Sequence, residues 1–63
     1  MAVMQIYDGL ENPPMLLERR SAQTVEELIR QADALSEKEH AEGYPCNAYI
    51  VYNNDGERVY QRW

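Results

Sequence analysis

His40 is the side chain best suited to proton transfer near neutral pH, and it stands beside three carboxylates, Glu37, Glu39 and Glu42. A histidine that acts as a general base needs a partner that orients its ring and a pocket that holds a substrate. His40 falls near the end of a predicted helix, which provides neither. We therefore expect a surface histidine without a catalytic role.

Cys46 is the only cysteine, so no disulfide can form within the chain. Its thiol and the single histidine would need carboxylates or a second chain to complete a zinc site. We expect Cys46 to be a small buried apolar residue in a reducing compartment, and not a reactive thiol.

The remaining nucleophile and ligand patterns are weak. Ser21 and Ser36 lack the glycine elbow that exposes a nucleophilic serine. The segment 53–57 superficially resembles a calcium loop, but it lacks alternating ligands and a terminal glutamate at the required spacing. Three scattered glycines form no phosphate cradle. We expect no catalytic residue, no metal ligand and no cofactor, and therefore no enzyme.

The charge balance narrows the choice of partner. Eleven acidic residues against six basic ones give a formal net charge of −5. Arg19 and Arg20 form the only basic pair, which is too little to track phosphates, and an anionic membrane surface would repel the chain. A protein with a basic surface would be attracted. Without a membrane-length apolar run or a basic, apolar leader at its start, the chain is expected to be cytoplasmic.

A helix is predicted over residues 24–41. Thr24 and Glu27 match the capping box that begins a helix, and Gly43 is typical of a helix end. The apolar residues of this segment follow the 3, 4, 7 spacing of one buried face: Val25, Leu28, Ile29, Ala32 and Leu35. Ser36 and Glu39 project from the same arc. Their polarity predicts that the last two turns overhang the sheet, or that an exposed, acid-rich helix end is offered to a partner.

A hairpin is predicted at the C-terminus. Residues 46–52 favour a strand, Asp55-Gly56 favours a tight turn, and residues 57–63 form the return strand. A two- or four-residue loop places three residues of each strand on one face: Ala48, Ile50, Tyr52, Val59, Gln61 and Trp63. Because this face is the more apolar, we predict that the helix covers it. A three-residue loop would reverse the pairing.

The N-terminal third completes the sheet. Val3 to Tyr7 alternates like a strand, and breakers at Asp8-Gly9 and 12–14 enclose a loop. Residues 15–20 are either a return strand, which we favour, or a short helix with Asn12 as its cap. The sequence thus predicts a single domain over residues 1–63 of the α+β class. In it, a four-stranded antiparallel sheet in ββαββ order carries the helix on one face.

Two surfaces are candidate interfaces. One is the acidic side of the helix, formed by Glu26, Asp33, Glu37, Glu39 and Glu42. The other is the sheet face predicted to lie away from the helix, with Tyr49, Arg58, Tyr60 and Arg62. Tyrosine and arginine are enriched at protein interfaces, so this second surface favours a partner or a homodimer.

In size, acidity and lack of an active-site motif, the whole chain resembles the small acidic inhibitors of bacteriophages and mobile elements, anti-CRISPR proteins among them. The resemblance implies a non-catalytic protein that acts in the host cytoplasm. It would bind a basic surface of a nucleic-acid-handling or defence complex, with the five helix acids imitating phosphates. The alternative is a small homodimeric adaptor or structural accessory subunit that acts through the Tyr/Arg sheet face. Neither function requires direct contact with nucleic acid or a membrane.

Overall fold

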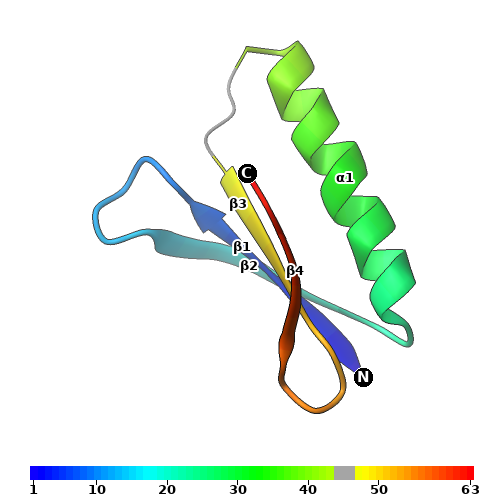
Figure 1. Cartoon of the computed structure of the whole chain (residues 1–63). Coiled ribbons are helices and arrows are strands. Elements are labelled where there is room, and N and C mark those ends of the chain that lie inside the picture. The colour runs from blue at the N-terminus through cyan, green and yellow to red at the C-terminus, as the bar shows by residue number, and fades with distance from the viewer. Residues whose placement is uncertain (44–46) are drawn as a thin grey trace.

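The computed structural model describes residues 1–43 and 47–63 (Figure 1). Along the chain lie β1 (Ala2–Asp8), β2 (Met15–Ala22), α1 (Val25–Ala41), β3 (Asn47–Tyr52) and β4 (Arg58–Arg62). The strands form one antiparallel sheet in the order β2-β1-β3-β4, and α1 lies across one of its faces (Figure 1). The predicted ββαββ architecture is therefore confirmed. The prediction for Cys46 falls outside the described residues.

The helix begins and ends where its sequence signals place it. The Thr24 hydroxyl oxygen accepts a hydrogen bond from the Glu27 backbone N–H at 3.3 Å, which satisfies one of the free donors of the first turn. After the last turn, Gly43 has a φ of +84°, in the left-handed region that favours glycine. Leu28 and Ala32 are fully buried against the sheet. The predicted apolar stripe is therefore the face that packs.

The strand interpretation of residues 15–20 is also correct, because Met15 begins β2 and the short helix is absent from this segment. The pairing of β2 with β1 shifts by one residue between Ile6 and Tyr7, so Leu17 is an extra residue in the ladder. β2 pairs with β1 alone in the sheet order and forms one edge of the sheet.

The hydrophobic core lies between α1 and the two central strands. Met4 and Ile6 of β1 stand opposite Val51 and Tyr49 of β3, and all four side chains are buried. Leu28 of α1 packs against this cluster. A core this small gives a 63-residue domain only about 3–9 kcal/mol of stability, so single polar contacts matter.

The predicted two- or four-residue loop of the C-terminal hairpin is wrong. The Asn53 backbone N–H donates a hydrogen bond of 2.9 Å to the Glu57 main-chain oxygen, which leaves a three-residue turn, 54–56, between them. The Asn53 side-chain oxygen accepts hydrogen bonds from the backbone N–H groups of Asp55 at 2.9 Å and Glu57 at 3.0 Å. Gly56 has a φ of +82°. A register shift then pairs Tyr52 with Arg58, whereas the sequence predicted that Val59 would share the face of Tyr52. Farther along, Ile50 pairs with Gln61 as predicted.

The sequence prediction is wrong about which face of this hairpin α1 covers. Tyr49 and Val51 point toward the helix and are buried, and the Tyr60 hydroxyl reaches α1. The alternate residues of β3, Ala48, Ile50 and Tyr52, point away from the helix. The reason lies outside the hairpin: the pairing of β3 with β1 aligns Tyr49 and Val51 with the buried residues Met4 and Ile6.

The predicted overhang of the last helical turns is wrong as well. Ser36 is completely buried, and its hydroxyl donates a hydrogen bond of 2.9 Å to the main-chain oxygen of Trp63. Glu39 is half-buried, and its carboxylate accepts a hydrogen bond from the Tyr49 hydroxyl. These two polar residues sit in the apolar stripe because the sheet face beneath them offers polar partners.

Candidate functional site

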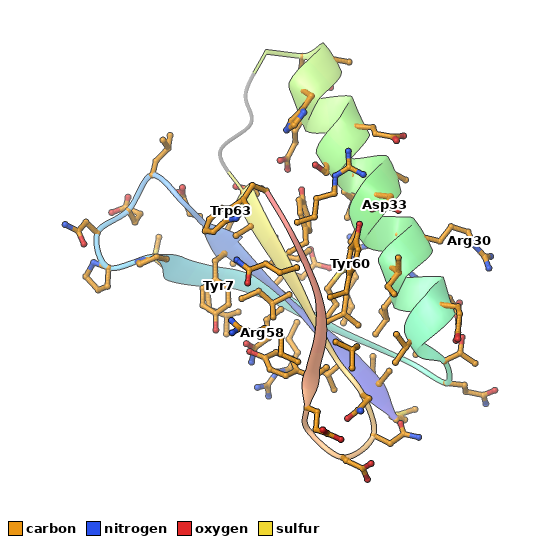
Figure 2. All side chains as sticks on the ribbon, in the orientation of Figure 1. Tyr7, Arg30, Asp33, Arg58, Tyr60 and Trp63 are labelled. Carbon is orange, nitrogen blue, oxygen red and sulfur yellow. The ribbon has the colours of Figure 1, made fainter. Side chains whose placement is uncertain are left out.

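Asp33, Tyr60 and Arg62 form one cluster between α1 and β4. Figure 2 shows two of them, Asp33 on the helix and Tyr60 on the strand. One oxygen of the Asp33 carboxylate accepts a hydrogen bond from the Tyr60 hydroxyl and another, of 3.0 Å, from the Arg62 guanidinium. The bond from Tyr60, and then that from Arg62, lower the pKa of Asp33. The same carboxylate raises the pKa of Tyr60. The cluster fastens the helix to the edge strand.

Glu39 accepts a second set of hydrogen bonds that link α1 to the sheet. In addition to the Tyr49 hydroxyl, its carboxylate accepts a hydrogen bond of 2.8 Å from the Asn47 side-chain amide. Tyr49 is only 1% exposed. The unusual aromatic set, five tyrosines and no phenylalanine, thus has an internal use, because tyrosine fills the core and also bonds the helix acids.

Four of the nine residues predicted to bind a partner are therefore engaged inside the fold, and Tyr49 is a core residue. Asp33, Glu39, Tyr60 and Arg62 bond one another or their neighbours across the helix–sheet boundary. They form neither a free acidic side nor a free Tyr/Arg face. The correction follows from the reversed hairpin, which turns Tyr49 toward Glu39 of α1, and Tyr60 and Arg62 toward Asp33.

The acids Glu26, Glu37 and Glu42 remain exposed on the helix. They share its outer surface with exposed bases, and Figure 2 shows Arg30 pointing away from the sheet. The outer side of α1 is therefore mixed in charge. Arg58 is the one member of the predicted Tyr/Arg set that lies on the sheet face away from the helix, because the register shift places it opposite Tyr52.

No helix or strand of the described residues covers that face, and we call it the open face. At its centre, β1 and β3 contribute Val3, Gln5, Tyr7, Ala48, Ile50 and Tyr52. The edge strands and the residue after β4 add Leu16, Arg19, Ser21, Arg58, Gln61 and Trp63. Trp63 is 61% exposed, and the side chain of Leu16 is also largely exposed. This apolar centre with a polar rim is the usual anatomy of a protein interface.

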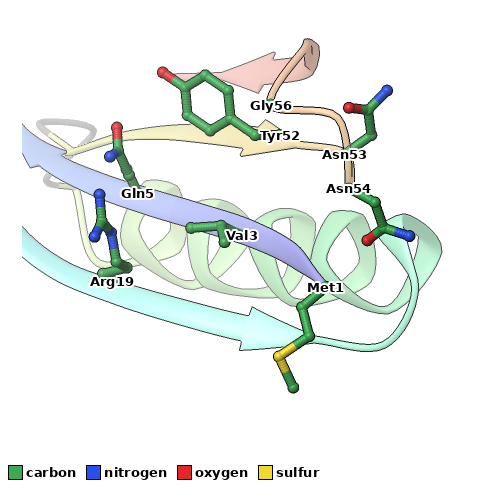
Figure 3. A pocket seen from close by; sticks show the side chains of 8 residues that line it. All are labelled: Met1, Val3, Gln5, Arg19, Tyr52, Asn53, Asn54 and Gly56. Carbon is green, nitrogen blue, oxygen red and sulfur yellow. The ribbon is translucent and has the colours of Figure 1, made fainter.

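Two hollows lie on the open face. The first, the Arg19 hollow, has a volume of about 350 Å³, and its walls include Val3, Gln5, Arg19, Tyr52, Asn53 and Asn54 (Figure 3). In Figure 3 these side chains stand on the side of the sheet away from the helix. The second, the Trp63 hollow, has a volume of about 260 Å³ and is lined by Tyr7, Pro14, Ala48, Ile50 and Trp63. The prediction that Ala48 and Trp63 share one face of the hairpin is thus correct.

The charges of the open face differ from those of the whole chain. Its two charged residues are Arg19 and Arg58, and the acids of the described strands point elsewhere. Glu18, for example, pairs with Ile6 on the helix side and bonds Arg20. A chain with a net charge of −5 thus carries a locally basic, aromatic face.

Sequence reasoning did not single out Tyr7, Arg19, Tyr52 and Trp63 as site residues. A signal was present in the alternation of β1, where Val3, Gln5 and Tyr7 form a face distinct from Met4 and Ile6. Only the pairing of all four strands, however, brings these four side chains to one surface.

The described part of the chain offers little for other chemistry. His40 is exposed, and residues 1–43 and 47–63 contain no group of three or more His, Cys, Asp or Glu side chains placed to hold a metal ion. Within the same ranges, no helix has the length and apolar character needed to cross a membrane. No protein-family model, curated protein or solved structure matched this chain.

Proposed function

We propose that this chain is a non-catalytic protein-binding module that docks a partner on the open face of its sheet. The observation that carries the proposal is the contrast between the two faces. One face is closed by α1, whereas the other presents aromatic and aliphatic side chains with two hollows among them. Exposed apolar surface of this extent marks interaction sites in small proteins.

The size of the face supports a modest interface. Four strands spaced by about 4.8 Å and about six residues long cover roughly 400 Å² before the relief of the side chains is counted. That area fits interfaces of less than about 1,200 Å² in total, the class of transient signalling encounters. A partner of this kind would also cover Trp63 and Leu16, which are otherwise left in solvent.

The charge of the face favours a different protein over a second copy. In a face-to-face homodimer, Arg19 and Arg58 of both copies would enter one interface. The acids of the described strands point away from this face, so none of them would pair with the arginines. Like charges brought together in this way cost affinity. The homodimeric adaptor is therefore the less favoured form of the proposal.

The test compares the two sides of the molecule. The full chain is immobilised and exposed to a lysate of the cells in which it is made, and bound proteins are quantified by mass spectrometry. Gln61→Glu and Ile50→Glu place an anion on the open face, and Gln61 is exposed enough for its variant to fold. Glu26→Lys with Glu37→Lys alters only the outer side of α1.

We expect the open-face variants to lose the partner by about tenfold or more and the helix variant to retain it. The opposite pattern would refute docking on the sheet. It would favour a second proposal, an inhibitor of the bacteriophage type that offers Glu26, Glu37 and Glu42 to a basic surface, since these acids remain exposed. Unchanged capture by all variants would contradict both.

A further inference from the structure

We infer that the partner of the open face is an extended peptide segment that carries a carboxylate and an apolar side chain about four residues apart. This inference rests on the proposed function and names the chemistry of the protein that binds. The carboxylate enters the Arg19 hollow and the apolar side chain enters the Trp63 hollow.

The Trp63 hollow selects an apolar group. Its walls are the faces of two aromatic rings, a proline ring and two aliphatic side chains, from Tyr7, Pro14, Ala48, Ile50 and Trp63. The one side-chain hydroxyl among them, that of Tyr7, already donates a hydrogen bond of 2.8 Å to Gln5. A polar side chain would lose its water here without a matching partner, whereas a leucine-sized group would bury apolar area.

The Arg19 hollow selects an anion. Arg19 supplies a guanidinium whose fork matches a carboxylate, and no acid is among the residues that line the hollow. The side-chain oxygen of Gln5 is occupied by the Tyr7 hydroxyl, so its amide N–H groups are the part left to donate. The Asn53 side chain is engaged in the hairpin turn, where its oxygen accepts two backbone N–H groups and its amide donates to Glu57. The donors that the hollow presents are therefore those of Arg19 and Gln5.

The spacing of the two hollows gives the pattern of the peptide. The Arg19 hollow extends from the Gln5–Arg19 pair to the Val3–Tyr52 pair, and the Trp63 hollow lies at the Tyr7–Ala48 pair, so the far end of the first hollow is four residues along β1 from the second. Four residues of a strand with a rise of about 3.3 Å span about 13 Å. In an extended peptide, side chains four positions apart point to the same side, so both can enter the sheet face together.

Other classes of partner fit the face less well. A single-stranded nucleic acid could stack on Tyr7, Tyr52 and Trp63, but two arginines neutralise few phosphates and the chain has a net charge of −5. A second copy meets the repulsion between like arginines described above. Both are outcomes that the following test can detect.

The experiment titrates the isotopically labelled full chain with short peptides and follows backbone amide resonances by NMR. The probe is a serine- and threonine-based peptide of about nine residues with one glutamate and one leucine four positions apart. Three comparison peptides replace glutamate by lysine, replace leucine by serine, or reduce the spacing to three, which turns the two side chains to opposite sides.

We expect saturable shifts at the open-face residues Val3, Gln5, Arg19 and Ile50 with the probe alone. Arg19→Glu should weaken binding by about fivefold or more, and Trp63→Ala by a similar factor, as for side chains that anchor an interface. The matched controls are Arg30→Glu, the same charge change on the outer side of α1, and Leu10→Ala, an exposed apolar residue outside both hollows. Both controls should bind like the unaltered chain.

Equal binding of all four peptides, or equal affinity of Arg19→Glu and Arg30→Glu, would overturn the inference. So would tighter binding of an oligothymidine, or a dimer in sedimentation that Arg19→Glu strengthens. The proposed function is separable from these results. If Gln61→Glu abolishes capture of a cellular partner while Arg19→Glu and Trp63→Ala do not, the face is an interface and the two-anchor peptide is wrong.

Discussion

The tie between Tyr49 and Glu39 offers a direct test of how this small fold is held together. Tyr49→Phe removes only a hydroxyl from a side chain that is 1% exposed and donates to a carboxylate. A hydrogen bond to a charged group contributes about 1.5–3 kcal/mol. Glu39 keeps its 2.8 Å bond from Asn47 and some access to water, so we expect a loss of about 1–2 kcal/mol. In a domain of this size that lowers Tm by about 5–15 °C.

The assay is urea unfolding followed by far-UV circular dichroism, with Tyr52→Phe as the control. Tyr52 lies on the open face, and removal of its hydroxyl should change the free energy of unfolding by less than about 0.5 kcal/mol. The slope of the transition should stay constant, since the buried surface is unchanged. In a Glu39→Gln background, Tyr49→Phe should cost about 1 kcal/mol less than in the unaltered chain. Equal stabilities of Tyr49→Phe and Tyr52→Phe would refute the reasoning.

Three further outcomes follow from the packing, the charges and the turn. Leu28→Ala, at a fully buried position, should cost about 2–5 kcal/mol in urea unfolding, whereas Leu10→Ala, at a position that is 80% exposed, should cost less than about 0.5. The pKa of Asp33 is lower in the folded than in the unfolded chain, so the ionised carboxylate stabilises the fold at pH values above the unfolded pKa of about 4. This stabilisation is lost as the pH falls through the folded-state pKa. Asp33→Asn should therefore reduce the loss of urea midpoint between neutral and strongly acidic pH, and an unchanged pH profile would contradict this. Gly56 has a φ of +82°, so Gly56→Ala should cost about 1 kcal/mol, and Gly56→Asn less.

Much of the fold was accessible from local patterns. The capping box at Thr24, the apolar stripe through Leu28 and Ala32, and the Asp55-Gly56 turn each act over a few residues, and the structure contains all three features. The same-face set of the hairpin was also largely predicted, since alternation and a turn decide it. The bulge that leaves Val59 as an extra residue in β4 was not predicted, because a bulge depends on how two strands pair and cannot be read from the sequence of either strand alone.

The candidate site was less accessible. Five of the predicted site residues (Asp33, Glu39, Tyr49, Tyr60 and Arg62) are engaged in the helix–sheet layer, whereas Glu26, Glu37, Glu42 and Arg58 remain exposed. The open face is assembled from all four strands, which pair across distances in sequence that no local pattern records.

Taken alone, the sequence determined the excess of acid and the type and approximate bounds of the helix, of the first strand and of the C-terminal hairpin, and it favoured the ββαββ order. It also contained polar residues, Ser36 and Glu39, in an otherwise apolar helical stripe. Only the tertiary structure decided which side of the sheet α1 covers, because both hairpin faces carry apolar residues and the choice depends on their alignment with Met4 and Ile6 of β1. That choice gives Ser36 and Glu39 their partners and leaves Arg19, Tyr52 and Trp63 for a partner to bind.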